Sequence, residues 1–130
     1  MKNGIFVITF SCEYGHKEPA SLNRCQIEHV FPQSPDAEWR EKLGDEAFST
    51  AWQANDRIGN LTLTAYNPSL SNKWFEKKKQ IYSESNVQLN RYFEHLQSWD
   101  AEQIDQRGRA LFEKAKLLWA KPEAVPGVNA

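Results

Sequence analysis

Apolar positions follow a helical spacing most clearly in the C-terminal part of the chain. Ile104, Leu111, Ala115 and Leu118 fall on one face, which predicts an amphipathic helix with that face buried. Asp100 and Gln103 stand at its start in the arrangement of a capping box, whose side chains bond the free amide groups of a first helical turn. We therefore expect a helix from about residue 100 to Trp119.

Three shorter helices are predicted upstream, over residues 34–44, 45–54 and from 68 or 71 to 82. The first ends at Gly44, since glycine readily adopts the left-handed conformation of a helix end. In the third, the lysines lie mostly opposite the apolar face. The residues expected to be buried on the second and third helices are Phe48, Ala51, Trp52, Trp74, Ile81 and Tyr82.

Two short extended segments are predicted in the first half of the chain. Residues 26–31 form one, which ends at Pro32, and residues 60–64 alternate leucine and threonine, which is typical of a strand with one buried face. Residues 5–10 also favour a strand, although a buried helix end fits so short a run equally well. These elements predict an α+β fold.

The length of 130 residues fits one domain. We expect residues 1–25 to pack on the core as an N-terminal segment, residues 26–120 to form the domain, and residues 121–130, with Pro122 and Pro126, to form a flexible tail. The opening sequence resembles the start of a fragment, so we expect the chain to be a piece of a longer protein.

Charge and cysteine content narrow the classes of protein. The formal net charge of -1 excludes an overall basic surface of the kind that many nucleic-acid-binding proteins carry. Cys12 and Cys25 form no CxxC pair, which argues against a cysteine zinc site and favours reduced thiols. The apolar run at residues 5–10 is too short to span a membrane, and no small-residue cleavage site follows it. We expect a soluble cytoplasmic protein.

One dense basic stretch stands out against this neutral background. Glu76 is the only acidic residue within it, and a basic patch of this kind can bind phosphate groups of a nucleic acid. A lysine run is more often the solvated face of an amphipathic helix, so both interpretations stay open. The candidate phosphate-binding residues are Lys73, Lys77, Lys78 and Lys79.

Three ordered blocks stand in the middle of the chain. The first block is residues 27–33 with Glu28-His29, the second is residues 58–63 with Gly59-Asn60, and the third contains Asn67, residues 70–73, Phe75 and Lys78. In this order they resemble the HNH endonucleases, and specifically the HNH domain of the GmrSD C-terminal type. The C-terminal helix is similar as well, and the resemblance spans residues 26–119. The residues that carry it there are Trp99, Ile104, Arg107, Leu111 and Trp119.

The resemblance implies a ββα-metal core embedded among several α-helices. It assigns His29 as the base that activates water and Asn60 as the amide that bridges the two strands and holds the histidine loop. Glu28 is implied as a metal ligand, with Asn67 as the second ligand and Asn72 as the alternative. Hard oxygen donors suit Mg²⁺ first and Mn²⁺ second, and zinc less.

The two central residues pose a geometric problem, because neighbours in a regular strand point to opposite sides. We expect a bulge or the strand end to bring Glu28 and His29 toward one phosphate. An ordinary histidine is largely neutral near pH 7, as a base must be. His16 in a loop and His95 on a helix lack such neighbours and are expected to be ordinary surface residues.

The resemblance implies a metal-dependent DNA endonuclease or nickase, the cutting module of a restriction or anti-phage defence protein that has further domains or subunits. Two alternatives stay open, a catalytically inactive nucleic-acid-binding module and a helical interaction domain. The five tryptophans are expected to be core anchors, since no aromatic series interleaves with the lysines as a base-stacking groove would need.

Overall fold

The computed structural model of the chain describes residues 25–65 and 70–119. The predicted strand at residues 5–10 and the predicted tail at residues 121–130 lie outside these ranges, as does Asn67. The described elements give an α+β fold, as predicted. In chain order they are β1 (Cys25–His29), α2 (Ala37–Leu43), α3 (Asp45–Gln53), the 3-10 helix η2 (Ile58–Asn60), β2 (Leu61–Ala65), α4 (Phe75–Ser83), the 3-10 helix η3 (Gln88–Phe93) and α5 (Ala101–Trp119).

The two strands form one antiparallel sheet with an unbroken register from Cys25 opposite Ala65 to His29 opposite Leu61. We predicted one buried face for β2, and this was wrong, because its leucines and threonines are both buried. The second face is covered by η3, where Asn90 bonds the hydroxyl of Thr62 and donates to the carbonyl of Leu63 at 2.9 Å. No repeating pattern in the sequence signals a 3-10 helix, so η3 was not predicted.

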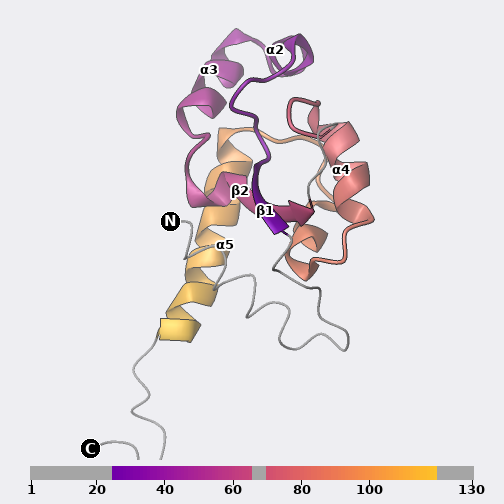
Figure 1. The fold of residues 1–130 in the computed structure, drawn as a ribbon. Coiled ribbons are helices and arrows are strands. Elements are labelled where there is room, and N and C mark those ends of the chain that lie inside the picture. Colours follow the sequence, from indigo (N-terminus) through magenta and orange to yellow (C-terminus); the bar gives the residue numbers. More distant parts are fainter. Residues whose placement is uncertain (1–24, 66–69, 120–130) are drawn as a thin grey trace, which may run out of the picture.

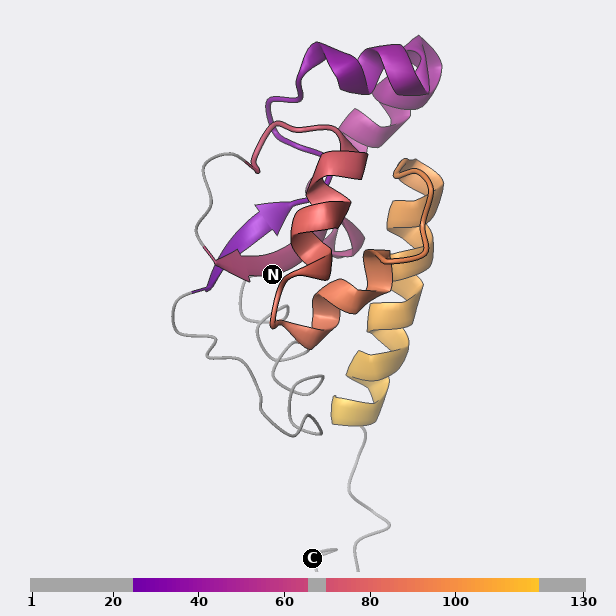
Figure 2. The ribbon, with the colours of Figure 1, turned by 90° about the vertical axis from the view of Figure 1, so that its right-hand side faces the viewer.

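The helices enclose this small sheet. In Figures 1 and 2, α2 and α3 lie at one end of the molecule, and α5 runs away from that end along its length. α5 also packs against η2, which leads directly into β2. None of the described helices combines the length and the apolar composition that a membrane-spanning segment needs.

An aromatic cluster fills the space between sheet and helices. Trp39 and Trp99 are fully buried, and Trp74 packs edge-on against Trp39, which confirms these three as core anchors. Trp52 and Trp119 are 46% and 61% exposed, so the expectation was wrong for them. α3 is anchored through Ala51 and Phe48. Trp52 follows Ala51 directly on the helix and therefore faces another way, while Trp119 lies at the far end of α5.

Helix limits agree with the sequence except at the starts of α2 and α4. α2 begins at Ala37, after Asp36 as its N-cap, and not at residue 34 as predicted. The cap of α5 is present, since the amide of Gln103 donates to Asp100 Oδ1 at 3.1 Å. α4 begins only at Phe75, because the preceding residues form a turn in which the amide of Lys73 donates to the carbonyl of Leu70. His95 lies in a turn after η3 rather than on a helix.

Gly59 should be irreplaceable in this packing. A Cβ on Gly59 would lie 1.9 Å from the backbone carbonyl oxygen of Ile104, whereas a Cβ on Gly108 would meet nothing closer than 3.8 Å. We expect Gly59→Ala to lower the free energy of unfolding by about 3 kcal/mol or more, because η2 must then move off α5. Urea denaturation measures this. Gly108→Ala is the control and should be neutral or stabilising, since alanine favours a helix; equal effects of the two would contradict the close packing.

Candidate active site

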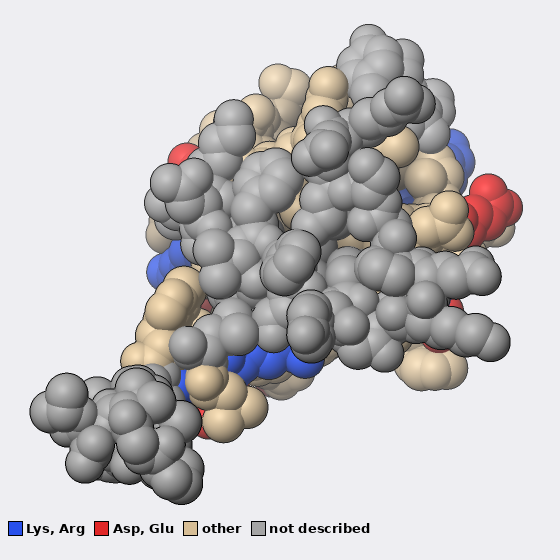
Figure 3. All heavy atoms as spheres, turned by 60° about the horizontal axis from the view of Figure 1, so that its bottom comes forward, with Lys and Arg blue, Asp and Glu red and all other residues tan. Residues whose placement is uncertain are grey.

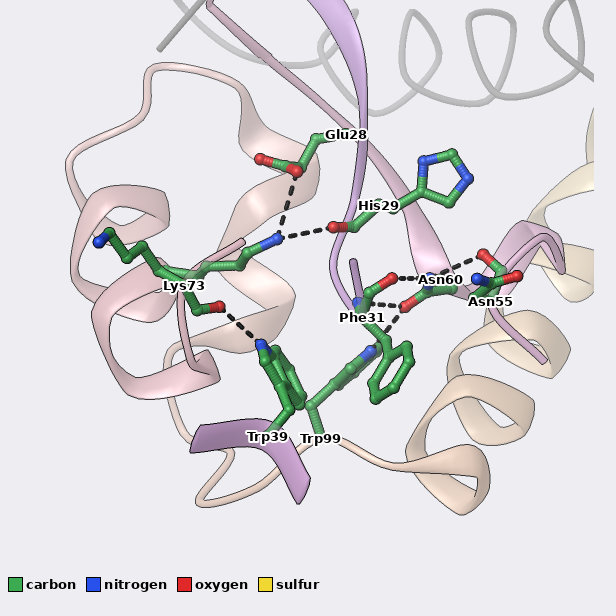
Figure 4. A network of polar contacts seen from close by, with 9 residues as sticks. Glu28, His29, Phe31, Trp39, Asn55, Asn60, Lys73 and Trp99 are labelled. Atoms are coloured by element: carbon green, nitrogen blue, oxygen red, sulfur yellow. Dashed lines mark hydrogen bonds and ion pairs between the residues drawn. The ribbon is translucent and has the colours of Figure 1, made fainter. Parts of the chain in front are cut away.

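Glu28 and His29 are the last two residues of β1. They lie opposite Thr62 and Leu61 in the regular register, so no bulge interrupts the pleat there. Figure 4 shows the consequence: the carboxylate of Glu28 and the imidazole of His29 project to opposite sides of the strand. The structure therefore does not bring these two side chains together as we had expected.

Glu28 instead faces α4, where it meets a buried lysine. Lys78 Nζ lies 3.3 Å from Glu28 Oε1 and donates to the carbonyl oxygen of His29 at 2.7 Å. The Lys78 side chain is completely buried, because it shares one helical face with Phe75 and Tyr82, which belong to the core. A residue expected on the solvated face of the helix thus reaches through the core to the end of β1.

Burial dominates the electrostatics of this pair. It raises the pKa of Glu28 above its usual value, against the opposing effect of the Lys78 ammonium. It likewise lowers the pKa of Lys78 to about 8, against the attraction of Glu28. Both shifts have the same physical origin, which is the loss of water around two charges. The pair is therefore a site where a carboxylate and a positive charge already compensate each other away from solvent.

His29 has a different partner on its own side of the strand. Its Nε2 lies 3.1 Å from Asp56 Oδ1, and the imidazole is 20% exposed. Asp56 belongs to the turn between α3 and η2. No pattern in the sequence predicted this contact, because an exposed aspartate in a turn is common. The arrangement supplies an accessible imidazole with a carboxylate bound to one of its two nitrogens.

Asn60 lies fully buried at the end of η2 and makes four hydrogen bonds (Figure 4). Its Oδ1 accepts from the amide of Phe31 at 2.7 Å and from Trp99 Nε1 at 2.8 Å. Its Nδ2 donates to the carbonyls of Phe31 at 2.9 Å and Asn55 at 2.8 Å. This amide uses all its bonding capacity to fix the segment that follows His29.

Of the two asparagines considered as metal ligands, the structure describes only Asn72. Asn67 lies outside the described residues. Asn72 is exposed in the turn before α4, and its backbone carbonyl accepts from the amide of Asp36 at 3.1 Å. The choice between Asn67 and Asn72 stays open.

The four lysines do not share one solvated face. Lys78 is buried as described, and Lys79 donates inward to the carbonyl of Leu96 at 2.9 Å. Lys77 is exposed, with its amine 4.0 Å from Glu38, and Lys73 is partly exposed. On the face shown in Figure 3, Lys and Arg atoms form separate groups among the described residues rather than one continuous surface. Lys73 and Lys77 therefore remain the better placed of the four for a phosphate contact.

The donor chemistry of the site fits a hard cation in one respect. Within residues 25–65 and 70–119, no group of three or more histidine, cysteine, aspartate or glutamate side chains is placed to hold a metal ion. Glu28 nevertheless offers carboxylate oxygens of the kind that Mg²⁺ and Mn²⁺ prefer.

The buried amide of Asn60 should be worth several hydrogen bonds of stability. Asn60→Ala leaves the polar groups of Phe31, Trp99 and Asn55 without their partner, so we expect unfolding to become easier by about 3 kcal/mol or more. Chemical denaturation followed by tryptophan fluorescence measures the loss. The exposed Asn72→Ala should stay within about 0.5 kcal/mol of the wild type, and a similar small effect of Asn60→Ala would refute the role given to this amide.

Removing one partner of the Glu28–Lys78 ion pair should lower the free energy of unfolding more than removing both charges. Lys78→Met strands the Glu28 carboxylate in the core, and we expect a loss of about 3 kcal/mol in the free energy of unfolding. The double variant Glu28→Gln with Lys78→Met should recover part of it, because no unpaired charge is left. Lys77→Met, at an exposed pair, should change stability by less than about 1 kcal/mol. A double variant less stable than Lys78→Met would contradict the pairing.

Comparison with known proteins adds to this geometry. The chain matches the model of one protein family, described as GmrSD restriction endonucleases, C-terminal domain, over residues 5–114. That stretch contains β1, β2, α4 and most of α5, and so every residue of the candidate site. A comparison with curated proteins finds no match. The match covers most of the chain and confirms the predicted resemblance to the GmrSD C-terminal type: the chain belongs to the family of GmrSD restriction endonuclease C-terminal domains.

Proposed function

We propose that the chain is a metal-dependent DNA endonuclease of the HNH type, which hydrolyses phosphodiester bonds at the end of β1. The observation that carries the proposal is the arrangement of two antiparallel strands followed by α4, with Glu28 and His29 at the strand end and Asn60 locking the chain beyond them. The family gives the reaction class, restriction-type cleavage of DNA. The metal and the HNH mechanism are our interpretation.

His29 acts as the base in this proposal. Its imidazole is accessible to water, and one ring nitrogen remains for a proton while the other bonds Asp56. Asn60 keeps the backbone of residues 29–31 in place, so that the base does not drift from the phosphate. Lys78 also holds this backbone in place, because its Nζ donates a hydrogen bond to the His29 carbonyl.

Glu28 binds the cation in this proposal, with Asn67 or, as the alternative, Asn72 as second ligand. A bound Mg²⁺ or Mn²⁺ would neutralise charge on the scissile phosphate and on the leaving oxygen. In an in-line displacement the attacking water and the leaving oxygen are on opposite sides of phosphorus. The divergence of Glu28 and His29 suits this requirement if the phosphate lies across the end of β1.

The remaining parts of the proposal concern the setting of the cut. Lys73 and Lys77 provide salt-sensitive contacts to the DNA backbone. The chain serves as the cutting module of a larger defence protein, whose other parts recognise the DNA. Nicking of one strand and cleavage of both are equally compatible with a single site of this kind.

Cleavage of supercoiled plasmid by the full chain tests the proposal. With Mg²⁺ or Mn²⁺ we expect nicked or linear product, none after chelation, and a rate for His29→Ala lower by about 100-fold or more, since a general base contributes at least that much. His95→Ala is the matched control, because that histidine is exposed in the turn after η3, and the variant should cut like the wild type. Glu28→Gln should raise the Mn²⁺ concentration needed for half-maximal cutting.

Three results would overturn the proposal in different ways. DNA binding without cutting by both the wild type and His29→Ala would favour an inactive binding module. Absence of DNA binding and of Mn²⁺ uptake would favour a helical interaction domain. Equal cutting by wild type and His29→Ala would leave the nuclease but remove His29 from its mechanism.

A further inference from the structure

The contact between His29 and Asp56 joins two segments that are 27 residues apart in the chain. Asp56 is 82% exposed, and a polar contact so open to water contributes little to stability. Its value for the fold is therefore small. Its value for the imidazole is larger, because a hydrogen bond to one ring nitrogen fixes both the orientation of the ring and the position of its proton.

The turn that carries Asp56 is anchored on both sides despite this exposure. The carbonyl of Asn55 accepts from the buried Asn60 side chain at 2.8 Å. Arg57 Nη1 donates to Asp105 Oδ1 on α5 at 2.7 Å. Because its two chain neighbours are held in this way, Asp56 has a defined place although its own carboxylate is in water.

Asn60 also holds the backbone next to His29, the partner of Asp56. Asn60 bonds the backbone of Phe31 in both directions, and its own carbonyl accepts from the amide of Val30 at 2.9 Å. One buried side chain thus sets the position of the strand end with His29 and of the turn with Asp56. The distance between imidazole and carboxylate is built into the fold rather than left to two free side chains.

The chemistry of the contact decides which nitrogen can act as base. A carboxylate only accepts hydrogen bonds, so the proton of a neutral imidazole must sit on Nε2 when Nε2 faces Asp56. Nδ1 then keeps its lone pair, and among the described residues no hydrogen bond occupies it. When Nδ1 takes a proton from water, the carboxylate stabilises the positive ring that results.

We propose that Asp56 is a positioning residue of the nuclease reaction, which holds His29 as the Nε2–H tautomer so that Nδ1 is the base. This inference rests on the proposed function. It adds to that function a residue outside the three blocks on which the resemblance stands. Asp56 touches neither DNA nor metal in this role and acts only through His29.

The test combines kinetics with nuclear magnetic resonance on the full chain. Asp56→Ala should lower kcat for Mn²⁺-dependent plasmid nicking by about 10-fold, as loss of a histidine's orienting partner does elsewhere, while KM for DNA and the melting temperature stay unchanged. Asp56→Asn keeps an acceptor oxygen and should retain more activity than Asp56→Ala. In ¹⁵N-histidine spectra, the His29 signals, identified by their absence in His29→Ala, should change from a single tautomer toward an average of both in Asp56→Ala.

Asp45→Ala is the matched control, because Asp45 is 85% exposed and its carboxylate likewise has one side-chain partner, Arg40 at 3.0 Å. It should leave kcat and the His29 signals unchanged. A second control tests the route of the effect: in the His29→Ala background, Asp56→Ala should cause no further loss of activity.

The outcomes separate this inference from the proposed function. Wild-type cutting with unchanged kcat and unchanged His29 signals in Asp56→Ala would overturn the role of Asp56 and leave the nuclease intact. A further loss in the His29→Ala background would also overturn it, since Asp56 would then act elsewhere. Absence of cutting by the wild type would overturn the proposed function and this inference together.

Discussion

The structure depends above all on the saturation of one buried amide. Asn60 offers two donor hydrogens and one acceptor oxygen, and it spends them on the backbone of Phe31, the carbonyl of Asn55 and the indole of Trp99. An apolar residue of the same size would leave all of these groups without hydrogen bonds in the interior. The free-energy penalty of such unsatisfied groups is larger than the net stabilisation that the hydrogen bonds provide. Almost no other residue can therefore replace Asn60, and the geometry of residues 29–31 depends on its hydrogen bonds.

In a sheet of two described strands, many backbone polar groups have no partner within the sheet. Buried polar side chains form hydrogen bonds with some of these groups. Asn90 serves the middle of β2, and Arg107 from α5 donates to the carbonyls of Gly59 and Leu61 at 2.9 and 2.6 Å. The guanidinium lies 4.8 Å from the centre of the Phe93 ring, so its flat face is covered as well. The interior is thus held by directed bonds as much as by apolar contact.

Local signals in the sequence predicted the elements well, and distant partners poorly. The leucine and threonine alternation located β2, and the Asp100 cap located the start of α5. Asn60 was found because it sits in a short block with Gly59. Lys78 was misplaced, because a lysine within a lysine run has the local pattern of a solvated residue, and its partner Glu28 is 50 residues away. No sequence pattern pointed to Asp56. The opposite directions of the Glu28 and His29 side chains follow from a regular pleat, which only the strand register reveals.

The bonds of Asn60 span 29 residues to Phe31 and 39 residues to Trp99. Contacts of such sequence separation form late, after the intervening chain has collapsed, because closing the loops between them costs entropy. The end of β1 and the segment leading into α5 must therefore become ordered in the same cooperative step. Local opening of the C-terminal helix would disorganise the strand end as well, so the two regions should exchange their amide hydrogens as one unit.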